Sequence, residues 1–346
     1  ANKIVGLDTT CIILRMTDGN SSFSTKNISL VNTRRVQEII IETALFLPVT
    51  LLALVGNILV LVAVYRNPRL QSTAHYFIAT LALTDLLSAC ISQPLTLTAL
   101  FSGKWQAGAF GCQLHGFFNS FLTYTSSYTM VLTAINRYVK VIRPQQYPRY
   151  FGKKQVLALL TFIWITNVVV TLAPVIGGWA RFEFVYVFAA CCLKFPKYRE
   201  ASWAGFEFTT FSLIPMIIIS FCYYRVSKTI QQHNQNANAS LRSAENSSTH
   251  IAEIRVTNIL FSLVFTFFAC IFIGFIMVLI CRVVAGSVLE SVGFILTYLI
   301  TLTTAVNPVL YTCTSKDFRK EFLLILSVQC KKLTTERVTP LPVMVK

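Results

Sequence analysis

From residue 109 to residue 138 the chain reads AFGCQLHGFFNSFLTYTSSYTMVLTAINRY. The part from 109 to 135 carries no Asp, Glu, Lys or Arg. A helix needs about 20 apolar residues to cross a bilayer, so this part is long enough. It is followed by Arg137, and a charge in or at the edge of a bilayer costs about 2.5–3.5 kcal/mol on insertion scales. Arg137 is therefore either a snorkelling anchor that marks the end of the helix or a residue kept for a partner.

The composition indicates a membrane protein. The 346 residues are 54% hydrophobic and 13% charged, whereas a soluble domain carries about 25% charged residues. Spanning segments in lipid must satisfy their own backbone, which makes them helices. The sequence predicts an all-α membrane protein with one seven-transmembrane helix bundle at 39–312, a tail at 1–38 and a second tail at 313–346. The seven apolar segments lie at about 39–65, 75–101, 109–135, 155–178, 205–229, 254–282 and 288–312.

The basic residues predict the orientation. If the N-terminus is extracellular, 19 of the 30 Lys and Arg residues lie on the inner side. An excess of basic residues marks the cytoplasmic face. We therefore expect a multi-pass protein of the plasma membrane. The pI of about 9.6 is then explained by contact with anionic lipid and an intracellular partner, not by nucleic acid.

The N-terminal tail has the features of an extracellular segment. Asn20 and Asn27 begin glycosylation sequons. Residues 1–38 contain no apolar core of the signal-peptide type. We expect the first helix to act as its own insertion signal.

Ten cysteines are scattered along the chain without zinc-ligand spacing. Cys112 begins the third span on the outer side, and Cys191 and Cys192 lie in the loop 179–204. A disulfide from Cys112 to one of this pair, with Cys191 favoured, would pin the loop over the bundle. The thiol that is left over has two candidate partners, Cys11 and Cys281.

The segment after the last span predicts a short amphipathic eighth helix on the cytoplasmic face. Phe318, Phe322 and Leu326 recur every four residues, which is typical of a helix lying on a membrane. A palmitoyl group on Cys330 would add a second anchor. The alternative is an inert thiol.

Polar residues inside the spans point to a functional centre. Asp85 lies in the second span, and an intramembrane Asp is a functional-site hypothesis by default. Its expected companions are Asn57, Ser126 and Asn307. Together they could hold Na⁺ or a hydrated network, or they could form a structural hydrogen-bond hub.

Four prolines predict helix kinks, because each removes a ladder hydrogen bond. They are Pro94, Pro174, Pro215 and Pro308. In a membrane the freed carbonyls need partners. Asn307 is the expected partner at Pro308.

Taken together, these positions resemble the rhodopsin-like (class A) G-protein-coupled receptors from about residue 45 to 326. The resemblance implies a ligand-activated receptor, not an enzyme, that drives nucleotide exchange on a heterotrimeric G protein. It also implies arrestin and a receptor kinase as partners. The matching motifs are Gly56-Asn57, Leu81-Ala82-Leu83-Thr84-Asp85, Asn136-Arg137-Tyr138, Trp164, Pro215 with Tyr223, and Asn307-Pro308-Val309-Leu310-Tyr311.

The resemblance also implies a switch. Arg137, next to Tyr138, would pair with Glu253 in the inactive state and contact the G protein in the active state. Outward movement of the sixth helix would open the G-protein cavity, with Tyr223 and Tyr311 turning inward. Asn307 and Pro308 would belong to the same switch, and Asp85, Ser126 and Asn307 match the sodium-linked network of the family.

The chain departs from the family pattern at several positions. Asn136 stands where the family usually has an acid, so Arg137 should be held less firmly. Thr303 replaces a usual Asn of the ion site. In the sixth span, Ile271 and Ile273 replace the usual Trp and Pro.

Within the family, residues 174–182 look most like opsins and, to a lesser degree, melatonin receptors. Thr301 stands where opsins have the retinal-binding lysine, so no covalent retinal is expected, and no cofactor apart from possible Na⁺ at Asp85. The ligand is expected to be an extracellular small molecule or short peptide. The expected pocket residues are Asn119, Thr123, Glu207, Phe275, Thr297 and Thr301.

Two alternatives stay open. The first is an opsin relative that binds a retinoid without a covalent link. The second, from a different class, is an ion channel or transporter that uses Asp85. The absence of a sequence repeat between the halves argues against the inverted-repeat transporters.

Overall fold

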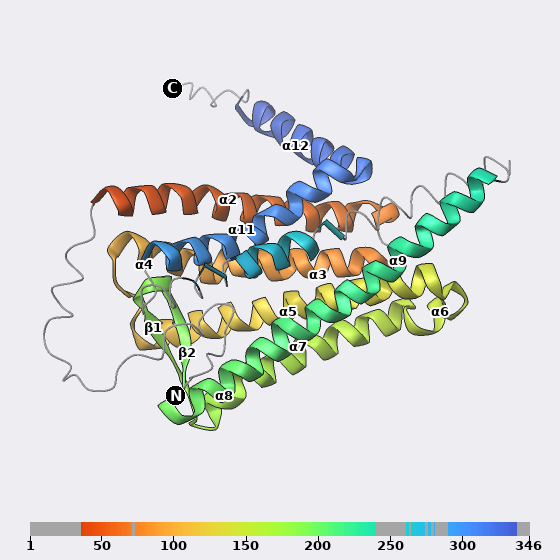
Figure 1. Ribbon diagram of the computed structural model, residues 1–346. Helices are drawn as coiled ribbons and strands as arrows, with labels where there is room; N and C mark the ends of the chain where they lie inside the picture. Colours follow the sequence, from red (N-terminus) through yellow and green to blue (C-terminus); the bar gives the residue numbers. More distant parts are fainter. Residues whose placement is uncertain are drawn as a thin grey trace, which may run out of the picture.

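The computed structural model describes residues 36–70, 73–239, 261–262, 264–273, 276–277, 280 and 290–337. Long helices lie roughly along one direction and form a bundle, with a hairpin at one end (Figure 1). We call this end the hairpin end and the opposite end the Arg137 end. The bundle helices are α2 (Val36–Arg66), α3 (Thr73–Leu87), α4 (Gln93–Ser102), α5 (Gly108–Ile142), α7 (Lys153–Ile176), α8 (Lys197–Phe208), α9 (Ile214–Ala239) and α11 (Glu290–Thr314).

Two pairs of these helices form single spans. A π-helical turn, Ser88–Ser92, joins α3 to α4, and another, Thr209–Leu213, joins α8 to α9. The remaining helices are the short α6 (Tyr147–Tyr150), near the Arg137 end, and α12 (Lys316–Arg337). Figure 1 shows α12 leaving the bundle at an angle to α11.

Five stretches are long and apolar enough to cross a membrane: Gln37–Arg66, Thr73–Ser102, Lys153–Ile176, Gly205–Gln232 and Ser291–Thr314. The predicted third span is also a continuous helix, α5. Because α5 packs against α3, α7 and α9, less of its surface faces lipid. It can therefore carry many hydroxyl groups. The predicted span 254–282 lies partly outside the described residues, and Val264–Ile273 is an apolar helix within it. The predicted helix bundle is confirmed for the part of the chain that the structure describes.

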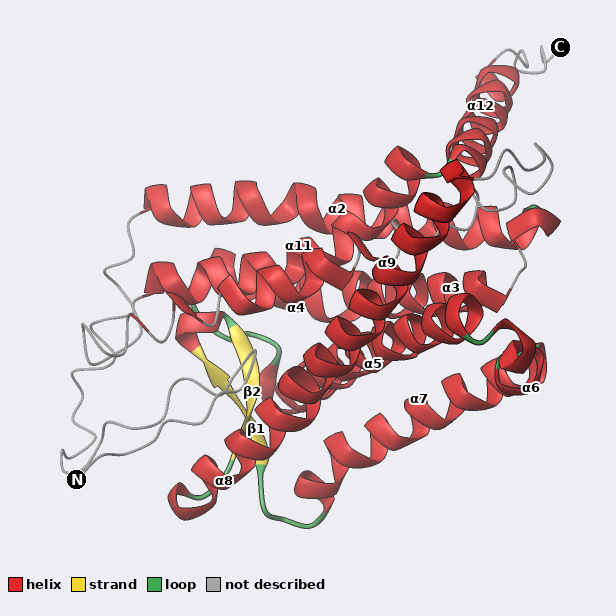
Figure 2. Cartoon of the chain, turned by 45° about the vertical axis from the view of Figure 1, so that its right-hand side comes forward, coloured by secondary structure: helices red, strands yellow, loops and turns green. Residues whose placement is uncertain are grey.

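The segment 179–204, which the sequence indicated only as a loop, contains a hairpin and the start of α8. Strand β1 (Arg181–Val185) pairs antiparallel with β2 (Ala190–Lys194), and Phe184 faces Cys191 in the register. Figure 2 shows both strands crossing the hairpin end of the bundle. The all-helical prediction therefore misses one two-stranded sheet.

Helix α12 has 22 residues and is longer than expected. Phe318, Phe322 and Ile325 are buried against the ends of α2, α3 and α11. Leu326 is 48% exposed, so it does not join Phe318 and Phe322 in this contact. A helix has 3.6 residues per turn, and a strict four-residue spacing drifts away from the buried face.

Side chains from neighbouring helices satisfy the carbonyls that two prolines free. Pro308 leaves the carbonyl of Thr304 without its helical donor, and Asn57 Nδ2 donates to it at 3.0 Å. The expectation that Asn307 serves this carbonyl is wrong, because Asn307 donates to Asp85 instead.

At the second kink, side chains of α5 donate hydrogen bonds to the backbone carbonyls. Pro215 frees the carbonyl of Phe211, which accepts a hydrogen bond from Ser127 Oγ at 2.9 Å. Tyr128 donates to the adjacent carbonyl of Thr210 at 3.0 Å. The small hydroxyl residue Ser127 therefore serves a carbonyl that Pro215 leaves without its helical donor.

Close packing of α2 on α11 requires Gly56. A Cβ atom added at Gly56 would lie 2.7 Å from Pro308 Cγ. The glycine therefore lets Asn57 reach the carbonyl of Thr304.

We expect Gly56→Ala to destabilise the protein by about 1–3 kcal/mol, because overpacking forces side chains and backbone apart. The measurement is the midpoint of thermal unfolding of the purified protein in nanodiscs. Gly205→Ala is the matched control, since its Cβ would meet no atom within 4 Å. Equal midpoints for the two variants would contradict this account of the contact.

Candidate ligand site and switch residues

A cavity of about 830 Å³, its open mouth included, lies inside the bundle under the hairpin. Its walls come from the second span, α5, α11 and the hairpin, together with Phe267 and Ile271 of the partly described sixth segment. Of the predicted pocket residues, the structure brings four together on its wall: Asn119, Thr123, Thr297 and Thr301.

The other two predicted pocket residues are placed differently. Glu207 is buried, with 3% of its surface exposed, but it is not among the described residues that line the cavity. Phe275 lies outside the described residues.

The cavity extends down to Asp85. Asn307 Nδ2 donates to Asp85 Oδ2 at 2.6 Å, and Ser126 Oγ bonds to Thr84 Oγ1 at 2.9 Å. Asn57 contacts the same region, because its Nδ2 donates to the backbone carbonyl of Thr304, a residue of the cavity wall. The structure therefore gathers all four predicted polar residues around the base of one cavity.

The groups at this base fit a small hard cation, which prefers oxygen ligands. Asp85 supplies a buried carboxylate, and Thr84, Ser126 and Thr303 supply hydroxyl oxygens that line the same cavity. Thr303 donates its hydrogen to the carbonyl of Ile300, so its oxygen keeps lone pairs for a ligand.

The hairpin forms the upper wall of the cavity, which sequence reasoning missed. Phe188 and Ala190 line it, and Phe188 is 1% exposed. Thr297 Oγ1 donates to the carbonyl of Phe188 at 3.0 Å. A Cβ added at Gly293 would lie 2.2 Å from the carbonyl oxygen of Val187, so glycine is needed where α11 meets the hairpin. The alternation in Arg181-Phe182-Glu183-Phe184 is the signal that could have predicted the strand.

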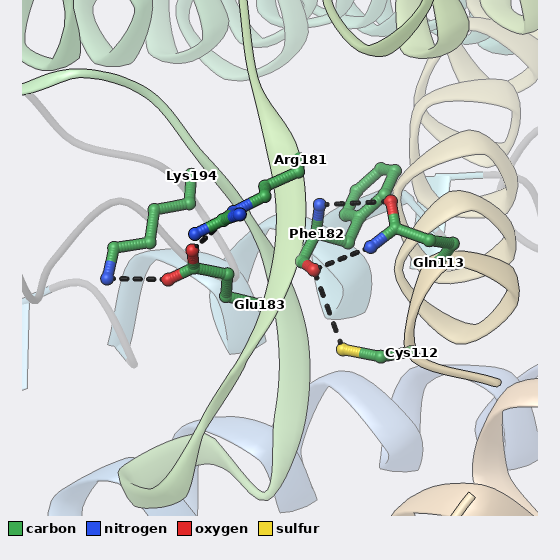
Figure 3. Close-up of polar contacts among 6 residues, drawn as sticks. All are labelled: Cys112, Gln113, Arg181, Phe182, Glu183 and Lys194. Carbon is green, nitrogen blue, oxygen red and sulfur yellow. Dashed lines mark hydrogen bonds and ion pairs between the residues drawn. The ribbon is translucent and has the colours of Figure 1, made fainter. Parts of the chain in front are cut away.

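Several contacts hold the hairpin to the start of α5 (Figure 3). Gln113 Nε2 donates to the carbonyl of Phe182 at 2.7 Å, and the Phe182 N–H donates to Gln113 Oε1 at 3.2 Å. On the outer side, Glu183 bridges Arg181 and Lys194 at 2.7 and 2.5 Å.

The predicted disulfide is confirmed: Cys112 is bonded to Cys191, with an S–S distance of 2.05 Å. Cys192 is also disulfide-bonded. Its candidate partners, Cys11 and Cys281, lie outside the described residues.

A buried histidine links the hairpin to the second span. His115 Nδ1 accepts from the N–H of Cys191 at 3.3 Å, and His115 Nε2 lies 3.0 Å from Thr96 Oγ1. Because Nδ1 accepts, a neutral ring carries its hydrogen on Nε2 and donates to Thr96.

At the Arg137 end, the predicted switch residues are buried. Arg137 is 1% exposed, Tyr223 3% and Tyr311 0%. The hydroxyls of both tyrosines lack a hydrogen-bond partner among the described groups. Tyr138 packs at the edge of the cluster that contains Tyr223. Glu253, the predicted partner of Arg137, lies outside the described residues.

A tyrosine that sequence reasoning missed holds Asn136. Asn136 Nδ2 donates to the hydroxyl of Tyr147 at 3.1 Å, and this hydroxyl lies 2.6 Å from Thr73 Oγ1. Tyr147 therefore ties α5 to the start of α3.

Three modification sites cannot be placed as side chains. Asn20 and Asn27 lie outside the described residues, and Cys330 lies in α12 at a point where side chains are not described.

Comparison with known proteins agrees with this arrangement. A family model described as "7 transmembrane receptor (rhodopsin family)" matches residues 56–311. Melatonin receptor type 1B-B of Danio rerio is 26% identical over 284 residues, which covers 80% of this chain and 79% of the relative.

Two further relatives match over shorter stretches. Melanopsin-B of Xenopus laevis is 28% identical, covering 53% of this chain and 34% of the relative. Octopamine receptor beta-1R of Drosophila melanogaster is 26% identical, covering 51% of this chain and 35% of the relative.

The family match spans most of the chain and includes Gly56, both cysteines of the Cys112–Cys191 disulfide, and Tyr311. The chain therefore belongs to the rhodopsin family of seven-transmembrane receptors, and it is a receptor and not an enzyme.

Proposed function

We propose that this receptor binds an extracellular small molecule and activates a heterotrimeric G protein. The observation that carries the proposal is the single cavity that runs from the hairpin to Asp85. Its wall combines apolar side chains, among them Phe188 and Phe267, with hydrogen-bonding groups that could fix the orientation of a small molecule. The names of two relatives, a melatonin receptor and an octopamine receptor, each specify a small molecule.

The proposed orientation places the N-terminus and the hairpin outside the cell, at the plasma membrane. The disulfide of Cys112 and Cys191 lies at the hairpin end, and disulfides persist in oxidising compartments. The opposite end is basic, with Lys140, Arg143 and Arg149 close to Arg137 in the chain, as the cytoplasmic face of a membrane protein should be.

The proposed switch is an outward movement of the sixth helix. Arg137 is buried, so it can contact a G protein only after the Arg137 end opens. The buried hydroxyls of Tyr223 and Tyr311 lack a partner among the residues that the structure describes, and an unsatisfied buried hydroxyl costs about 1–3 kcal/mol. An open state that gives these hydroxyls partners would recover this energy, so the closed state is suited to a bistable switch.

We further propose that no retinal is bound covalently. A Schiff base needs an amine, and the described residues that line the cavity include no lysine, while Thr301 offers a hydroxyl that donates to the carbonyl of Thr297. We therefore propose a diffusible ligand.

The first test is nucleotide exchange by purified G proteins with the receptor in nanodiscs. We expect exchange by at least one G-protein class, either without ligand or with a compound from a small-molecule screen. Arg137→Ala should abolish the exchange while leaving ligand binding in place. Failure of every G-protein class under all these conditions would contradict the proposal.

The second prediction concerns the restraint at Asn136. Asn136→Asp should lower ligand-free exchange by about fivefold or more, because a carboxylate can hold both Tyr147 and the guanidinium of Arg137. Tyr147→Phe should raise ligand-free exchange, since it removes the hydrogen bond to Asn136. An unchanged or higher rate for Asn136→Asp would show that the restraint lies elsewhere.

The third prediction concerns Na⁺ at Asp85. Replacing choline chloride with sodium chloride at equal ionic strength should raise the thermal midpoint of the wild type, since a ligand that binds the folded state stabilises it. Asp85→Asn should remove this difference. A midpoint that responds equally in both proteins, or in neither, argues against a sodium site.

A further inference from the structure

The cavity is polar but carries little charge. Asp85 is the one residue with an ionisable acid or base among the described residues that line it. Most of the others carry a hydroxyl or amide group. The chemistry of a ligand therefore depends on which of these groups can donate a hydrogen bond and which can only accept one.

Six of the seven threonines that line the cavity, all except Thr96, already use their hydroxyl hydrogens on backbone carbonyls. On α11, Thr301 donates to Thr297 at 2.9 Å, and Thr304 donates to Thr301 at 2.7 Å. On α5, Thr123 donates to Asn119 at 2.7 Å. A hydroxyl has one hydrogen, so these groups offer only lone pairs to the cavity. The same holds for Thr84, Thr297 and Thr303, which donate to Leu81, Phe188 and Ile300 respectively.

The hydrogen bond that Thr304 donates to the carbonyl of Thr301 fixes the orientation of the Gln93 side-chain amide. Gln93 Nε2 lies 2.9 Å from Thr304 Oγ1. Because the hydrogen of Thr304 is bound to the carbonyl of Thr301, Thr304 Oγ1 can only accept. The amide nitrogen of Gln93 must therefore face Thr304, and its oxygen must face away.

The oxygen of Gln93 is an unpaired acceptor in the cavity wall. Gln93 is 4% exposed, and its Oε1 has no hydrogen-bond partner among the described groups. The neighbouring Ser92 Oγ is buried and unpaired in the same way. Both residues line the cavity where the π-helical turn meets α4. An unsatisfied buried acceptor destabilises the empty site, and a ligand that donates to it would remove this penalty.

We infer that Gln93 Oε1 determines specificity in this cavity, and that the ligand is a small molecule with an N–H or O–H group that donates to it. The inference rests on the proposed function only in taking the cavity as the ligand site. A ligand with acceptors alone would set its lone pairs against those of Gln93, Thr301 and Thr304. A neutral amide and a protonated amine share the required N–H chemistry.

The test measures binding without a G protein, as the ligand-induced shift of the thermal midpoint of the receptor in nanodiscs. Matched probes separate hydrogen-bond donation from charge. N-acetyltryptamine is compared with its analogue methylated on both nitrogens, and phenethylamine is compared with phenethyltrimethylammonium, which keeps the charge but has no N–H. We expect the N–H member of at least one pair to bind about tenfold or more tightly.

Variants assign this preference to Gln93. Gln93→Met keeps the length of the side chain and removes the acceptor, so the preference for the N–H member should fall to about twofold or less. Thr304→Val removes the group that orients the amide and should weaken the preference, and Thr304→Ser should restore it. Thr98→Val, on the exposed face of α4, is the control and should leave the preference unchanged.

Each outcome decides between the proposals. A methylated member that binds as well as its N–H partner in both pairs overturns the inference, as does a Gln93→Met variant that keeps the preference. If no N–H probe binds, the inference is also overturned, whereas nucleotide exchange with another ligand would leave the receptor function standing. Donor-selective binding without nucleotide exchange would support the subsite and contradict the proposed function.

Discussion

The hydrogen bond from Asn57 to the carbonyl of Thr304, 3.0 Å long, connects the fold of the bundle with its cavity. Pro308 creates the need for this bond, and Gly56 provides the space for it. Because Asn57 serves the carbonyl, Asn307 is free to bind Asp85. The side chain of Thr304, one turn before Pro308, in turn orients Gln93. The need to hydrogen-bond every backbone carbonyl in the membrane therefore determines which side chains at the cavity base can bind other groups.

The hairpin imposes the second constraint. Its attachment to α5 through the Cys112–Cys191 disulfide and through Gln113 holds Phe188 inside the bundle end. Ala189 adopts a positive φ of 47° directly after Phe188. This left-handed conformation is costly for a non-glycine residue, and the surrounding contacts hold it. The upper wall of the cavity is thus built by a segment whose position depends on tertiary contacts.

This difference explains what could be predicted from the sequence. The helices follow from long apolar segments, because in lipid the backbone has almost no alternative. Asp85 and Asn307 could be paired from their cost in a membrane and from the family resemblance. The roles of Gln93, Tyr147 and Phe188 could not be predicted from the sequence, because each depends on contacts with a distant element. The burial of Ile325 in place of Leu326 depended on the rotation of α12, which a four-residue repeat does not determine.

Ile271 and Ile273 stand where class A receptors usually have Trp and Pro, so the proposed switch needs other groups to connect the cavity to the Arg137 end. Phe267 and Ile271 line the cavity and also belong to, or pack against, the apolar cluster that contains Met130 and Tyr223. The side chain of Tyr138, next to Arg137, packs against the same cluster. Close-packed interiors shift between discrete arrangements because they resist continuous deformation. We therefore propose that a ligand which displaces Phe267 or Ile271 acts on Tyr223 through the side chains of this cluster, without an aromatic toggle or a proline hinge in the sixth segment.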